Sequence, residues 1–188
     1  MSKKLVLIAL LLASPSLGEC TNYHYKIFSD GNDGAILPYI TLYSTYTQSI
    51  SATDAVQYIE LNSHLNGDGH FTQISKSTWS VVDHGVYEFC YSGIVDITDP
   101  PSGKMEIWGR INGVDVPDSN TIVAVVTAVE QVVALCWIGP LNANDTFAAM
   151  TYGSDTNLRW LYTAASSSPD RPATPSFIMT VKKVSGLH

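Results

Sequence analysis

The feature that most limits the fold of this chain is a two-residue alternation of side chains within short segments. Residues 85–97, GVYEFCYSGIVDI, are the clearest case, because three aromatic residues fall on one face of an extended chain: Tyr87, Phe89 and Tyr91. Similar segments recur along the sequence with turn residues between them roughly every ten positions, and none keeps a helical period. The pattern predicts an all-β fold, either a sandwich or a barrel.

One hairpin can be predicted residue by residue. The segment EIWGRINGVDVPDSNT, residues 106–121, contains Asn112-Gly113 between two strand-like runs. Asn-Gly favours a two-residue turn because both of its positions need positive φ. Such a turn pairs Ile111 with Val114 and Arg110 with Asp115. We expect the charged pair to be a solvated contact, and Pro117 to end the strand.

The most apolar segment, TIVAVVTAVEQVVALCWI at 121–138, needs a separate interpretation. Its length suits a membrane helix, but Val, Ile and Thr favour strands, and Glu130 near its middle would be costly in a bilayer. We therefore expect two buried strands joined by a tight turn near Val129–Gln131. Apolar residues at both odd and even positions favour a strand covered on both faces.

The N-terminus has the pattern of a secretory signal. Lys3 and Lys4 precede a short apolar run, and small residues suit cleavage before Glu19. Residues 1–18 are therefore expected to be a signal peptide or, alternatively, a hydrophobic arm buried in an assembly. A lipoprotein anchor at Cys20 is disfavoured because Glu19 replaces the small residue it needs. Residues 19–35 are predicted to be a polar arm, with an ordinary turn at Asp30–Gly34.

Cysteine usage gives no disulfide framework, because the chain has three cysteines: Cys20, Cys90 and Cys136. Their spacing does not suit zinc. Cys90 and Cys136 lie in apolar runs, so the residues alone predict buried free thiols.

Composition and motifs argue against several functions. The net charge of −7 over 188 residues, without a basic cluster, argues against nucleic-acid binding. Only 14% of residues are charged, which suits either surface covered by partner subunits or a surface rich in Ser, Thr and Asn. There is no nucleophile elbow and no phosphate-binding loop. We expect no enzyme activity, no cofactor and no metal.

The titratable residues are explained without a catalytic site. The histidines are scattered in polar segments without ligand spacing: His24, His64, His70, His84 and His188. Four aspartates lie close in sequence around predicted loops: Asp96, Asp99, Asp115 and Asp118. Paired carboxylates could hydrolyse glycosides, but turns and strand ends account for these four residues.

The order of several motifs resembles the tumour-necrosis-factor-like jelly roll, the fold of the complement globular head. The motifs are GVYEFCYSG, EIWGRINGVDVPDSNT, ALCWIGPLNANDTF and RPATPSFIMTVKKV, and their form is similar to microbial and viral versions of the fold. The resemblance covers residues 36–184 and leaves 185–188 as a tail. It implies a two-sheet antiparallel jelly-roll sandwich. Asn144 departs from the family's usual glycine, but Asn tolerates the left-handed conformation.

The resemblance also has implications for pairing and assembly. In relatives the strands that hold Cys90 and Cys136 are neighbours, so a cross-strand disulfide is conceivable. Domains of this fold usually form trimers with aromatic residues near the axis. The candidates, which could alternatively fill the core of one subunit, are Tyr39, Tyr43, Tyr46, Tyr87, Phe89, Tyr91 and Trp137.

The sequence is compatible with two functions. The favoured one is a non-enzymatic virion structural protein on the particle surface, a homotrimer that contacts capsid or other virion proteins. It would decorate or cement a capsid, or form a spike or fibre head. The alternative is a secreted oligomeric binding module that recognises a host-surface glycan or protein through its end loops. The signal-like N-terminus supports the alternative.

Overall fold

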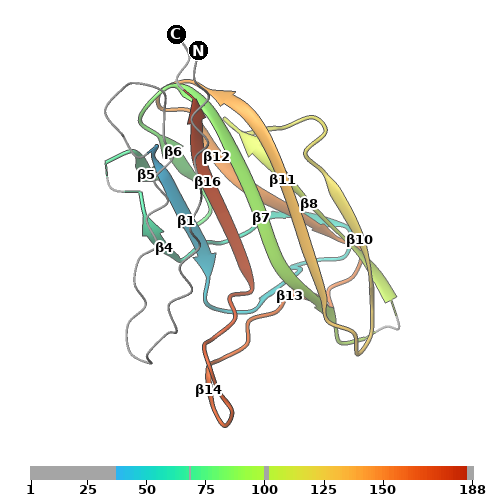
Figure 1. Ribbon diagram of the computed structural model, residues 1–188. Helices are drawn as coiled ribbons and strands as arrows, with labels where there is room; N and C mark the ends of the chain where they lie inside the picture. Colours follow the sequence, from blue (N-terminus) through green and yellow to red (C-terminus); the bar gives the residue numbers. More distant parts are fainter. Residues whose placement is uncertain (1–36, 68, 100–101, 186–188) are drawn as a thin grey trace, which may run out of the picture. The chain divides into compact units, whose positions relative to one another are not determined.

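The first and last long strands, β1 (Tyr39–Ser44) and β16 (Phe177–Ser185), lie side by side in one antiparallel sheet (Figure 1). The structure is a computed structural model that describes residues 37–67, 69–99 and 102–185. These residues form strands, turns and loops without a helix, so no helix among them is long and apolar enough to cross a membrane. The expectations for residues 1–35, which include Cys20 and His24, and for His188 lie outside the described residues.

Two sheets make up the fold. In the first sheet the strands lie in the order β4-β1-β16-β7-β11, and short β13 and β2 continue it past the end of β16. The other strands of this sheet are β2 (Gln48–Ser49), β4 (Ser63–Asn66), β7 (Gly85–Ile97), β11 (Gln131–Leu141) and β13 (Leu158–Trp160).

The second sheet has the order β5-β6-β12-β8-β10, with β3 beside β12 and β9 beside β8. Its strands are β3 (Ala55–Tyr58), β5 (Phe71–Gln73), β6 (Trp79–Val81), β8 (Ser102–Ile111), β9 (Val114–Asp115), β10 (Thr121–Val126) and β12 (Thr146–Gly153). A separate ribbon joins β14 (Ser166–Ser167) to β15 (Asp170–Arg171).

The chain crosses between the sheets in the order of a jelly roll. From β6 it passes to β7 in the first sheet, then to β8 and β10 in the second, back to β11, and again to β12 before it ends in β16. Eight strands thus form two four-stranded Greek-key layers: β1, β6, β7, β8, β10, β11, β12 and β16. The all-β, two-sheet expectation is confirmed.

The core lies between the two sheets and is rich in aromatic residues. Strand β7 alternates buried and half-buried positions as its sequence predicts, so the side chains of Tyr87, Phe89 and Tyr91 point inward. Phe147 of the second sheet meets Phe89 edge-on at 5.5 Å. Trp160 is fully buried against Phe177, with ring centroids 5.0 Å apart. Burying each such ring stabilises the fold by roughly 1.5–3 kcal/mol.

The Asn112-Gly113 hairpin is confirmed. Both residues have positive φ, 51° and 78°, and the pairs Ile111–Val114 and Arg110–Asp115 form as predicted. The side chain of Asn112 makes further bonds, because its amide donates to Asp145 at 2.7 Å. The hairpin is thereby tied to the turn that joins β11 to β12.

Local structure departs from the sequence pattern at two places. Residues of the kinds found at Ser63–Asn66 favour turns, but these four pair with β1 as strand β4. The apolar segment 121–138 does form two strands with a turn, yet β10 and β11 belong to different sheets. Each exposes alternate residues, so within the described part of the chain neither strand is covered on both faces.

Candidate functional site

The outward face of the first sheet differs from an ordinary solvated face. Cross-strand register places its residues in rows, because alternate residues of each strand point away from the core. The middle row runs Thr41–Thr180–Cys90–Cys136 from β1 to β11. The two flanking rows are Tyr43–Ile178–Ser92–Ala134 and Tyr39–Lys182–Glu88–Ile138. We call these twelve residues the outer face.

The outer face is poor in charge. It contains one acidic and one basic residue, Glu88 and Lys182, and these oppose one another in the register of β7 and β16. The same side of β11 continues the apolar character with Val132, which is 71% exposed, while Ile138 is 62% exposed. The solvent-facing residues of an antiparallel sheet are normally polar and alternate along each strand with apolar residues that face the core. Depletion of charge together with exposed aliphatic side chains is typical of a surface that other protein covers.

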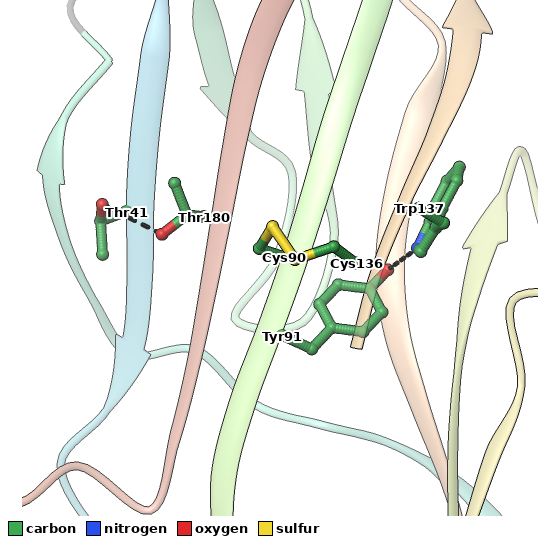
Figure 2. The surroundings of a disulfide bond; sticks show 6 residues. All are labelled: Thr41, Cys90, Tyr91, Cys136, Trp137 and Thr180. Atoms are coloured by element: carbon green, nitrogen blue, oxygen red, sulfur yellow. Dashed lines mark hydrogen bonds between the residues drawn. A yellow bond between two sulfur atoms is a disulfide. The ribbon is translucent and has the colours of Figure 1, made fainter. Parts of the chain in front are cut away.

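A disulfide lies in the middle of this face. Cys90 and Cys136 are register partners with Cα atoms 4.1 Å apart, and their sulfur atoms are bonded. Figure 2 shows the bond beside Thr180, whose hydroxyl lies 3.5 Å from that of Thr41. The expectation of buried free thiols is therefore wrong. Cys136 is exposed, since both cysteines point away from the core that their apolar neighbours fill.

The aromatic candidates for an assembly axis separate into two groups. The side chains of Tyr87, Phe89 and Tyr91 belong to the core of the single chain. Trp137 also packs on the core, because its ring stacks on Phe89 at 4.2 Å and its indole nitrogen donates to the Tyr91 hydroxyl at 3.1 Å (Figure 2). Burial raises the pKa of Tyr91 above its ordinary value, so the phenol stays protonated.

The other aromatic candidates lie on or near the surface. Tyr39 and Tyr43 are half-buried members of the outer face. Tyr46 follows β1, and its hydroxyl donates to the carboxylate of Glu60. Burial, reinforced by that carboxylate, raises the pKa of Tyr46 to about 12. Of the seven candidates, Tyr39 and Tyr43 are the two that a partner covering the outer face would contact.

A polar cluster lies on the outward side of the second sheet. The guanidinium of Arg110 donates to Asp115 at 2.7 Å and lies over the ring of Tyr58, with 5.4 Å to the ring centre. The bond to Arg110 is the main reason that the pKa of Asp115 is lowered. Asp115 is about half exposed, so the pair is the solvated contact that the sequence predicted.

The four aspartates that lie close in the sequence do not form one cluster in the structure. Asp96 is buried and paired with Arg159, whose Nε donates at 3.0 Å, whereas Asp115 pairs with Arg110. Asp99 and Asp118 are exposed in turns. This arrangement is not the paired carboxylates of a glycosidase.

The described histidines are also separate. His64 contacts the ring of Trp79 edge-on at 5.2 Å, and Nδ1 of His70 lies 2.8 Å from Asp83. That contact is the main cause of a lowered pKa for the Asp83 carboxyl. Within residues 37–67, 69–99 and 102–185, no group of three or more His, Cys, Asp or Glu side chains could hold a metal ion.

Comparison with known proteins adds little to this geometry. No protein-family model and no curated protein matches the sequence. Among solved structures, the chain is similar to the globular domain of zebrafish complement 1qA protein, with 12% identical residues and a TM-score of 0.49. The match covers 80% of this chain and 99% of that one. The class assigned here, a two-sheet antiparallel jelly roll, follows from the strand order of the chain itself.

Proposed function

We propose that the protein is a non-enzymatic virion structural protein, a homotrimeric jelly roll on the particle surface. It would decorate or cement a capsid, or form a spike or fibre head. The observation that carries the proposal is the charge-poor outer face, which the described residues of one chain leave open to solvent. Burying exposed aliphatic and tyrosine side chains between copies gains roughly 25 cal/mol per Å² of apolar area.

The edges of the sheets support the same arrangement. Among the described residues, strand β11 pairs with β7 on one side only, and β10 pairs with β8 on one side only. Unpaired edges beside exposed apolar residues such as Ile122 and Val132 invite contact with another chain. A ring of three copies satisfies such surfaces and closes, whereas an open head-to-tail array would grow without limit.

The alternative, a secreted oligomeric binding module, is equally compatible with the disulfide. The bond between Cys90 and Cys136 suits an oxidising environment such as the extracellular space or a virion surface. A secreted module would use the same trimer and present its end loops to a glycan or a protein.

The experiment that separates the two candidates locates the natural protein and determines its first residue. Virions purified by density gradient and the cleared medium are each analysed by intact mass and N-terminal sequencing. Recovery of the chain in stoichiometric amounts with the particles supports the virion protein. Recovery of the chain free in the medium, beginning at Glu19 and absent from particles, would support the secreted module instead.

A further inference from the structure

We propose that Asn144 carries an N-linked oligosaccharide. This inference goes beyond the proposed function, because it concerns how the chain is made and modified and not what it assembles into. The starting observation is that Asn144-Asp145-Thr146 is the one Asn-X-Ser/Thr motif in the 188 residues. Motifs of this form are acceptors for glycans when they lie on the surface of a secreted chain.

The structure places the acceptor in the open. Asn144 is exposed in the turn between β11 and β12, with φ at 70°. Its backbone amide donates to Val81 at 2.8 Å, which fixes the turn. Among the described residues, the side-chain amide of Asn144 has no hydrogen-bond partner, so a glycan on that nitrogen would displace no contact.

The neighbours of Asn144 perform the structural bonding of this turn. Asp145 accepts from Asn112, and the backbone amide of Thr146 donates to Asn112 at 2.8 Å. The Thr146 hydroxyl also lies 3.3 Å from the Asn112 side-chain oxygen. Because Thr146 is engaged in the folded turn, the transfer would take place on the unfolded chain, and the finished fold would then display the glycan.

A second observation concerns the compartment. The Cys90–Cys136 disulfide is the kind of bond that forms in the endoplasmic reticulum, where N-glycans are also attached. The position of Asn144 is compatible with assembly as well. It lies three residues after Leu141, the last residue of β11, and the eleven residues of that strand, roughly 36 Å long, separate it from the β10–β11 turn. A glycan there would project from one end of the sandwich and leave the outer face open.

The reaction is a glycosyl transfer from a lipid-linked oligosaccharide pyrophosphate, catalysed by a membrane oligosaccharyltransferase. Nδ2 of Asn144 forms a bond to the anomeric carbon of the sugar. The bond from that carbon to the pyrophosphate oxygen breaks, the amide nitrogen loses a proton, and the lipid pyrophosphate leaves. No oxidation or reduction is involved.

The test expresses the full chain, with its own residues 1–36, in a eukaryotic secretory host. The protein is digested with and without peptide-N-glycosidase, and the peptide containing Asn144 is analysed by mass spectrometry. We expect a gel shift on deglycosylation and conversion of Asn144 to aspartate. Asn144→Gln should abolish the shift, whereas Thr146→Ser, which keeps the hydroxyl, should retain it.

The outcomes that overturn the proposal are equally specific. Disulfide-bonded protein with unmodified Asn144 would refute it, and so would retention of the unmodified chain in the cytosol of the host. Because Asn144→Gln removes the amide from a left-handed turn, Asn144→Gly serves as a second variant that lacks the acceptor but suits the backbone. The mass of the assembled protein is measured on the same samples, so failure of the glycan and failure of the trimer are distinguished.

Discussion

Cys90 and Cys136 face one another across β7 and β11 and are joined by a disulfide, 46 residues apart in the sequence. The bond links the middle of the first sheet to its edge strand. Closing a loop of this length restricts the unfolded chain, which stabilises the fold by up to about 4 kcal/mol. The edge strand of the outer face is therefore held covalently.

Removal of this bond is predicted to lower stability without changing the fold. The double variant Cys90→Ala/Cys136→Ala should lose about 2–4 kcal/mol in the free energy of unfolding, measured by urea titration without reductant. Wild-type protein in reductant should approach the same midpoint, while the variant should not respond to reductant. A wild-type midpoint that reductant leaves unchanged would mean that the bond is absent.

At Gly113 of the hairpin turn, the backbone conformation and not steric crowding is predicted to limit which side chains are tolerated. A Cβ at Gly113 would meet nothing within 4 Å, but φ is 78°, which a β-branched residue resists. Gly113→Val should therefore destabilise by more than about 1 kcal/mol in thermal unfolding. Gly113→Asn is the matched control and should lose less, because Asn tolerates the left-handed region. Equal melting temperatures for both variants and wild type would contradict the turn.

The burial of Tyr91 predicts that the folded protein becomes less stable at alkaline pH. Because burial raises the pKa of Tyr91 above its ordinary value of 10.0, the unfolded state loses this proton first. The associated stability is complete below pH 10 and declines as the pH rises further. Burial also raises the pKa of Tyr87 to about 12, which acts in the same direction.

The measurement compares urea midpoints at about pH 8 and about pH 11. Tyr91→Phe should lose about 1 kcal/mol at the lower pH, since the Trp137 indole loses its acceptor. The same variant should show a smaller decrease than wild type between the two pH values. A decrease as large as that of wild type would show that the Tyr91 phenol does not contribute to it.

Local chemistry explains which features could be predicted from the sequence. The Asn112-Gly113 turn was predictable because its two residues carry the conformational preference themselves. The inward face of β7 was predictable because its aromatic residues alternate with others. Asn144 was predicted to tolerate a left-handed turn, and its φ of 70° confirms it.

Features that depend on partners distant in sequence do not follow from local patterns, and the disulfide was suggested by the family resemblance alone. The disulfide requires Cys90 and Cys136 to share one register position, which spacing along the chain does not reveal. Strand β4 exists because its backbone bonds to β1, although its residues, SHLN, favour a turn. The run 121–138 is apolar at both parities, yet one set faces the core and the other is open. Periodicity alone cannot distinguish a surface awaiting another copy from a buried one.

Val132, which extends the outer face along β11, yields a prediction about assembly. Val132→Lys should dissociate the trimer at micromolar concentration, because a charge covered by another copy loses its hydration. Val114→Lys is the control: Val114 is similarly exposed, at 70%, but lies on the β8–β9 hairpin. In both variants the free energy of unfolding of the single chain should stay within about 0.5 kcal/mol of the wild-type value. Identical masses for the two variants would place the contact between copies elsewhere.

The most direct test of the whole account is the mass of the wild-type protein in solution. Light scattering coupled to size-exclusion chromatography, at micromolar concentration and without reductant, measures it independently of shape. We predict three times the mass of one chain at every concentration tested. A single-chain mass under those conditions would contradict the claim that the outer face is covered by other copies.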